Sequence, residues 1–109
     1  LGFPTANVPM GDYVLPRLGV YATRTRLPDG REAPGVANIG TRPTVAGVRQ
    51  QLEVHLLDVT MDLYGRHIEV VLRAKLRNEQ RFASLDALKQ QIANDVVTAR
   101  KFFGLQTPV

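Results

Sequence analysis

The sequence contains no cysteine and no tryptophan, and only 6% of its 109 residues are aromatic. Without cysteine, the chain cannot form a disulfide scaffold, use a thiolate nucleophile or bind zinc through sulfur. It also lacks any apolar run approaching the roughly 18 residues of a membrane-spanning helix, and it has no signal-peptide pattern. The scarcity of aromatic side chains disfavours a surface on which single-stranded nucleic acid would stack.

What is present is typical of one globular domain with a basic surface. Hydrophobic residues make up 44% of the chain and charged residues 22%, and the formal net charge is +4. A basic domain suits an anionic partner, so charge alone leaves both nucleotide binding and RNA binding open. We expect residues 1–109 to form a single domain with a frayed tail at 105–109.

The alternation of apolar and polar residues predicts antiparallel strands in the first two thirds of the chain. The first 19 residues, rich in glycine and proline, are interpreted as structured loop, and Gly40–Gly47 as another loop. A hairpin is expected over 19–39, turning at Pro28-Asp29-Gly30, followed by strands over 50–59 and 67–76. In the last strand, Ile68 to Leu76 should present a single inward face.

The hydrophobic period changes to three or four residues near the C-terminus. This stripe predicts one amphipathic helix over about 84–103, and its members are Leu85, Leu88, Ile92, Val96, Ala99 and Phe103. Ser84 is a suitable N-cap and Gly104 a suitable stop signal. Strands followed by a single helix favour a small barrel or a two-layer sheet whose open end the helix covers.

Few residues stand out as candidates for chemistry. Thr5 and Asn7 offer two hard oxygen ligands that could face one cation or phosphate, although a turn capped by its own side chains would use the same residues. Glu53, within a strand, could be a general base or an exposed residue of a half-solvated sheet. His55 and His67 are interpreted as surface or rim residues. No short nucleotide-binding motif occurs.

Several blocks of the sequence, taken together, carry a specific resemblance. They are Leu1-Gly2-Phe3-Pro4-Thr5-Ala6-Asn7, Gly19-Val20-Tyr21-Ala22, Gly35 to Thr44, Leu52-Glu53-Val54-His55-Leu56-Leu57-Asp58, Asp62-Leu63-Tyr64-Gly65, and Leu76-Arg77 with Glu79 and Phe82. In this order they resemble the riboflavin kinase domain of the bacterial bifunctional riboflavin kinase/FAD synthetase family, over residues 1 to about 104.

The resemblance implies a six-stranded antiparallel Greek-key barrel with one C-terminal α-helix. It also implies an enzyme that transfers the γ-phosphoryl group of ATP to the 5′-hydroxyl of riboflavin, giving FMN and ADP, with Mg²⁺ as cofactor. The family's first strand precedes the block at residue 1, so the domain is interpreted as N-terminally truncated. An FMN adenylyltransferase domain is expected upstream, in a cytoplasmic protein with neither nucleic-acid nor membrane partners.

The family's functional residues fall on particular positions of this sequence. Glu53 corresponds to the catalytic glutamate, and Thr5 and Asn7 correspond to the Mg²⁺ ligands. The implied nucleotide- and phosphate-binding residues are Gly2, Phe3, Pro4, Thr5 and Asn7, and the implied flavin-binding residues are Tyr64, Arg77 and Phe82.

Two alternatives remain open beside the kinase. One is a catalytically incompetent fragment that binds flavin or nucleotide, and the other is a small basic RNA-binding barrel.

Overall fold

The computed structural model describes residues 5–8, 17–59 and 65–105. These residues form five strands followed by one helix. The elements are β1 (Thr5–Val8), β2 (Gly19–Arg26), β3 (Glu32–Thr44), β4 (Gly47–Leu56), β5 (Glu69–Arg77) and α1 (Leu85–Phe102). The expected combination of antiparallel strands and a single C-terminal helix is therefore confirmed.

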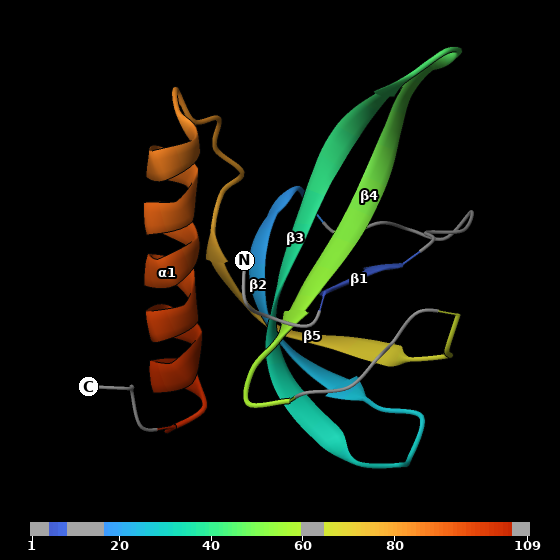
Figure 1. Ribbon diagram of the computed structural model, residues 1–109, viewed down its shortest axis with the longest axis vertical. Coiled ribbons are helices and arrows are strands. Elements are labelled where there is room, and N and C mark those ends of the chain that lie inside the picture. Colours follow the sequence, from blue (N-terminus) through green and yellow to red (C-terminus); the bar gives the residue numbers. More distant parts are fainter. Residues whose placement is uncertain (1–4, 9–16, 60–64, 106–109) are drawn as a thin grey trace.

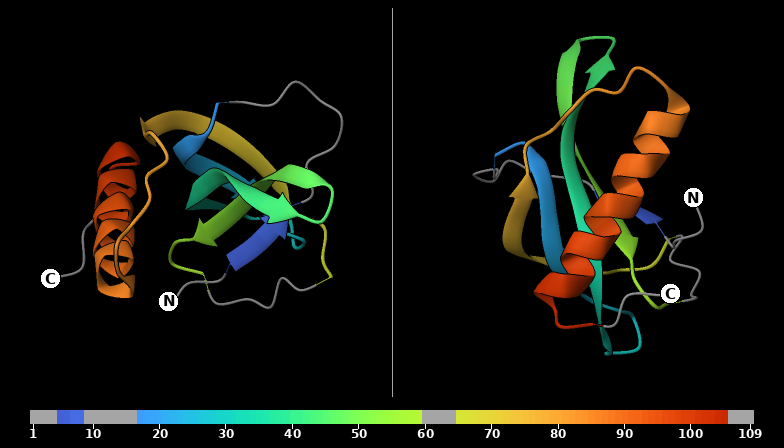
Figure 2. Two further views of the ribbon diagram at one scale, coloured as in Figure 1. Left: turned by 90° about the horizontal axis from the view of Figure 1, so that it is seen from above. Right: turned by 90° about the vertical axis from the view of Figure 1, so that its left-hand side faces the viewer.

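The five strands form one antiparallel sheet with the order β1-β4-β3-β2-β5. The consecutive strands β2, β3 and β4 pair as hairpins, and β5 returns to lie beside β2, which is the Greek-key arrangement. The sheet curls strongly around its own axis, and α1 stands against one side of it (Figures 1 and 2). The described part of the chain thus contains five of the six strands that the resemblance implies.

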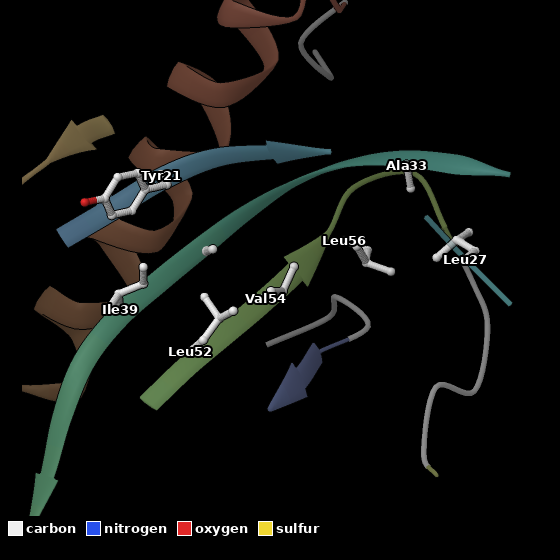
Figure 3. Packing of buried hydrophobic residues seen from close by; sticks show 8 residues of the cluster. Tyr21, Leu27, Ala33, Ile39, Leu52, Val54 and Leu56 are labelled. Atoms are coloured by element: carbon white, nitrogen blue, oxygen red, sulfur yellow. The ribbon is translucent and has the colours of Figure 1, made fainter. Parts of the chain in front are cut away.

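One face of the sheet, here called the inner face, carries the main hydrophobic core. Its buried residues are Tyr21, Leu27, Ala33, Ala37, Ile39, Leu52, Val54 and Leu56 (Figure 3). In β4 these are every second residue, because successive side chains of a strand point to opposite faces. The predicted division of β4, with Leu52, Val54 and Leu56 on one face, is confirmed.

The opposite face, here called the helix-side face, is covered by α1. Val20, Val36 and Leu57 pack there against Ala99 of the helix. The N-cap of the helix is Ser84, whose hydroxyl accepts a hydrogen bond from the backbone N–H of Ala87 at 3.1 Å. Both predicted caps are confirmed, because Gly104 adopts a φ of +70° just beyond the helix.

The helix ends in a complete Schellman motif. The backbone N–H of Gly104 donates to the carbonyl of Lys101, and that of Leu105 donates to the carbonyl of Arg100. Leu105 is thereby bonded to the helix end, whereas residues 106–109 of the expected tail lie outside the described residues. At the other end, Leu85 is 63% exposed, so its predicted place in the buried stripe is wrong.

Strand β5 departs from simple alternation. Its pairing with β2 shifts register between Val20 and Tyr21 and again between Ala22 and Thr23. At each shift β5 advances by two residues while β2 advances by one, as in a β-bulge. The extra residue changes the face of the sheet on which the following side chains of β5 lie. Leu72 consequently packs on the inner face and Leu76 on the helix-side face, so the single inward face predicted for this strand is wrong.

Two segments predicted as loops are strands. Thr5–Val8 pairs with β4, and Gly40–Thr44 continues β3 as a long ribbon paired with the start of β4. The ribbon projects beyond the sheet, in green in Figure 1, and turns at residues 45–46. Proline at position 43 is compatible with this because, among the described residues, β3 and β4 pair there only with each other, so one side of each strand is an edge.

Candidate active site

The candidate residues lie in one row that crosses the sheet. In the strand register, Asn7 of β1 is opposite Glu53 of β4, and Glu53 is opposite Asn38 of β3. The row continues through Val20 of β2 to Arg77 of β5. Residues opposite each other on antiparallel strands share a face, so tertiary structure gathers on one face positions that are as much as 70 residues apart.

A cavity of about 270 Å³ lies over this row, between the helix-side face and α1. Its walls are formed by three parts of the chain. The sheet contributes Val20, Val36, Asn38, Glu53 and His55; residues 77–82 contribute Arg77, Glu79, Gln80 and Phe82; and the helix contributes Leu88, Ile92, Asp95 and Val96. The cavity is therefore apolar over much of its wall and carries a few convergent polar groups, as small-molecule sites do.

Glu53 is the accessible carboxylate of the sheet wall. Its side chain is 40% exposed, and its Oε1 lies 3.1 Å from Nε2 of His55. His55 itself is only 7% exposed, so its interpretation as a surface or rim residue is wrong. His67 is exposed, as predicted. Burial lowers the pKa of His55 below its ordinary value of 6.5, although the Glu53 carboxylate opposes this shift.

Arg77 and Asp95 join β5 to the helix at the edge of the cavity. Nε and Nη2 of Arg77 each donate to one carboxylate oxygen of Asp95 at 2.8 Å, and Gln91 donates to the same carboxylate at 3.0 Å. The Arg77 guanidinium also lies 5.8 Å from the centre of the Phe82 ring. The ion pair thus fixes the segment that leads into residues 78–82 against the helix.

Residues 79–82 approach the sheet closely at Gly40. A Cβ atom at position 40 would collide with Oε1 of Glu79, so the Glu79 side chain can keep this position only beside a glycine. The same segment also borders a second hollow of about 590 Å³ beside Thr41 and Pro43 at the base of the ribbon. Phe82 lines both hollows.

Of the nine predicted site residues, the structure brings Glu53, Arg77 and Phe82 together in one cavity. Thr5 and Asn7 are two residues apart on β1, opposite His55 and Glu53, so they share a sheet face. The remaining four predicted residues, Gly2, Phe3, Pro4 and Tyr64, lie outside the described residues.

The donor chemistry of Thr5 and Asn7 fits the implied metal. A hydroxyl and a carboxamide oxygen are hard, neutral ligands of the kind that Mg²⁺ accepts together with phosphate oxygens. In the parts of the chain that are described, no group of three or more histidine, aspartate or glutamate side chains could hold a metal by itself.

Among the polar residues of the cavity, sequence reasoning assigned no site role to Asn38, His55 and Asp95. Asp95 occupies a slot in the apolar helix stripe, between Ile92 and Ala99, yet it is 5% exposed. A charged residue within an apolar helix stripe indicates that its side chain is buried and paired with another polar group, and this signal was available in the sequence. For His55 the available signal was the apolar residue Leu57, which lies on the same face of the strand. An apolar residue there indicates that this face is covered by another part of the chain, and Leu57 is indeed buried.

Comparison with known proteins gives a consistent family. The family model described as Flavokinase, riboflavin kinase, matches residues 1–103. The chain is 70% identical over 108 residues to the bifunctional riboflavin kinase/FMN adenylyltransferase of Escherichia coli K12, covering 99% of this chain and 34% of that protein. The corresponding protein of Haemophilus influenzae is 50% identical over 104 residues, which cover 95% of this chain and 34% of that protein. The chain thus spans about a third of the length of the curated relatives it matches.

A solved structure also resembles the fold. A crystal structure described as a macrolide-efflux protein from Streptococcus pneumoniae matches with a TM-score of 0.80 and 29% identity, over 91% of this chain and 33% of that one. In the described residues of this chain, no helix is long and apolar enough to cross a membrane. The family model covers nearly the whole chain, including the strands that carry Asn7, Glu53 and Arg77, and so this chain belongs to the riboflavin kinase family.

Proposed function

We propose that this chain transfers the γ-phosphoryl group of ATP to the 5′-hydroxyl of riboflavin, producing FMN and ADP. The observation that carries the proposal is the Glu53 carboxylate, which lines a cavity from the centre of a paired strand. A side chain on such a rigid element can be aimed accurately at a substrate.

Glu53 is proposed to act as the general base. It accepts the proton of the riboflavin 5′-hydroxyl while the hydroxyl oxygen forms a bond to the γ-phosphorus of ATP. The bond from that phosphorus to the bridging oxygen breaks, and ADP leaves with the electron pair. The proton on Glu53 then passes to solvent, to which the 40% exposed side chain has access.

Thr5 and Asn7 are proposed to hold the nucleotide phosphates through Mg²⁺, with Gly2, Phe3 and Pro4 beside them. When bound, Mg²⁺ would neutralise charge on the phosphate oxygens. Supporting this assignment, Asn7 is the register partner of Glu53, which would place the phosphates next to the base.

The flavin is proposed to contact Phe82, Tyr64 and the wall that Arg77 supports. Phe82 borders both hollows, so a planar ring system in either of them could contact it. Because the Arg77 guanidinium donates two hydrogen bonds to Asp95, we assign Arg77 the role of fixing this wall.

Replacement of the base tests the proposal. Glu53→Gln keeps the shape of the side chain and removes its negative charge, so kcat for FMN formation should fall by at least about a hundredfold. Glu69→Gln, which changes an exposed glutamate of β5, is the matched control and should leave kcat unchanged. A kcat for Glu53→Gln within about threefold of the parent would contradict the assignment.

The alternatives make different predictions in the same assay. A fragment that only binds flavin or nucleotide would show flavin fluorescence quenching with Mg-ADP but would make no FMN. An RNA-binding barrel would show neither. The relatives' second activity, FMN adenylyltransferase, is proposed to reside outside these 109 residues. A cytoplasmic location is also proposed, because the proposed reaction consumes ATP.

A further inference from the structure

We infer that His55 is a positioning residue, which donates a hydrogen bond from Nε2 to Glu53 and holds that carboxylate in its reactive orientation. The inference rests on the function proposed above, because it concerns the orientation of the proposed base. It assigns to His55 no contact with either substrate.

The difference in exposure between Glu53 and His55 indicates which of them can contact the substrate. Oε1 of Glu53 lies 3.1 Å from Nε2 of His55, and the side chains are 40% and 9% exposed, respectively. Substrate entering the cavity can therefore meet the carboxylate, whereas the imidazole lies deeper in the wall. The two residues are on the same face of β4, two positions apart, so the rigid strand fixes their separation.

The protonation state of the pair determines the direction of the hydrogen bond. Nε2 of His55 lies 3.1 Å from Oε1 of Glu53, within hydrogen-bond distance. An ionised carboxylate can only accept, so the proton must be on Nε2. The other carboxylate that acts electrostatically on His55 is Asp95, and Asp95 is paired with Arg77.

A positioned carboxylate matters because proton transfer requires a close approach. A general base must reach the donor oxygen within roughly 2.6–3.2 Å. A glutamate has three side-chain torsions, and a partly exposed one samples several rotamers. One hydrogen bond at Oε1 restricts these torsions, while a carboxylate retains further acceptor sites for the substrate hydroxyl.

Two substitutions of His55 separate positioning from packing. His55→Leu keeps apolar bulk and removes the donor, so kcat should fall by about tenfold or more while both KM values stay within about twofold. His55→Gln keeps an N–H at a similar distance along the side chain and should restore kcat to within about threefold of the parent. His67→Gln, at the exposed histidine, is the matched control and should change nothing.

The kinetic pattern can overturn the inference in two ways. Equal losses of kcat in His55→Leu and His55→Gln would show that the donor is irrelevant. A rise in KM that accounts for the loss in kcat/KM would show that His55 contributes to substrate binding instead. The midpoint of thermal unfolding of each variant is measured alongside, since an effect on packing would lower it in both variants.

A second measurement does not depend on turnover. Nitrogen-15 spectra of the imidazole at neutral pH report which ring nitrogen carries the proton, and Nε2–H is expected for His55. Glu53→Ala should shift that signal, because the acceptor is lost. An Nδ1–H tautomer, or no response to Glu53→Ala, would overturn the inference. A parent protein that makes no FMN would instead overturn the proposed function, and the spectra would still decide whether His55 holds Glu53.

Discussion

The two faces of β4 are built from alternating residues of one strand, yet they differ in almost every property. On the inner face, Val54 and Leu56 are fully buried among other aliphatic side chains. On the helix-side face, Glu53 and His55 form a polar pair in the wall of a cavity. The strand thus has one packed apolar face and one polar face beside a cavity, because side chains alternate with a period of two.

The comparison extends to the elements that cover each face. The inner face is closed by the curling sheet itself, whose strands bring eight buried residues into one cluster (Figure 3). The helix-side face is covered by a separate element, which touches β2, β3 and β5 and leaves a cavity between itself and the sheet. A packed sheet face has no space for a ligand, whereas a helix laid across a sheet can leave space.

Leu56→Ala should have the largest effect on stability. Leu56 is fully buried on the inner face, so its truncation removes apolar contacts and leaves a cavity, at a cost of about 2–5 kcal/mol. Chemical denaturation measures this cost. Glu53→Gln, three positions away on the opposite face, should leave the free energy of unfolding nearly unchanged. A similar loss in both variants would contradict the division between the faces.

Asp95→Asn should destabilise the protein by about 2 kcal/mol, because it leaves the partly buried Arg77 charge without its ionised partner. Denaturation monitored by circular dichroism gives the value.

The double variant Arg77→Met with Asp95→Leu should recover most of that loss, since apolar pairs can replace buried ion pairs. The double variant should nonetheless bind riboflavin more weakly, because the pair fixes the segment that carries Phe82. Unchanged flavin affinity would contradict that role.

A smaller effect is expected from the titration of His55. Its pKa is lowered by burial, so between pH 6.5 and that lower pKa the unfolded chain binds a proton that the folded protein does not. The free energy of unfolding should therefore fall as the pH drops through this window and become independent of His55 below it. Urea titrations of the parent and His55→Gln at several pH values isolate this contribution. An identical pH dependence in both proteins would contradict it.

Val48→Ala should have the smallest effect, within about 0.5 kcal/mol of the parent. Val48 lies on the projecting ribbon of β4 and is 73% exposed. Val54→Ala makes the same substitution in the same strand at a fully buried position and should cost well over 1 kcal/mol. Equal losses from the two valines in thermal unfolding would show that the ribbon packs against another surface.

Local sequence patterns predicted much of this architecture. Alternation correctly separated the two faces of β4, and the stripe from Leu88 to Ala99, with Ser84 and Gly104, correctly located the helix. These features are local, since side-chain direction depends on neighbouring residues and caps depend on the last turn. The specific sequence blocks identified the family, and with it Glu53 as the candidate base.

Predictions from local patterns failed where the backbone conformation depends on pairing with a segment distant in the sequence. Gly40–Thr44 contains a glycine and a proline, and Thr5–Val8 lies within a stretch rich in both, yet pairing with β4 makes both segments strands. The bulges of β5 likewise arise from its pairing with β2 and redirect Leu76 to the helix-side face.

The sequence by itself determined which residues could perform chemistry, because a carboxylate, an imidazole and a guanidinium are properties of single residues. Only the tertiary structure decided which of them lie together. It brought Asn7, Glu53, Asn38 and Arg77 into one row through strand register, and it buried His55 against Glu53 beneath the helix. Register and burial depend on contacts between segments far apart in the chain, which no local pattern of residues specifies.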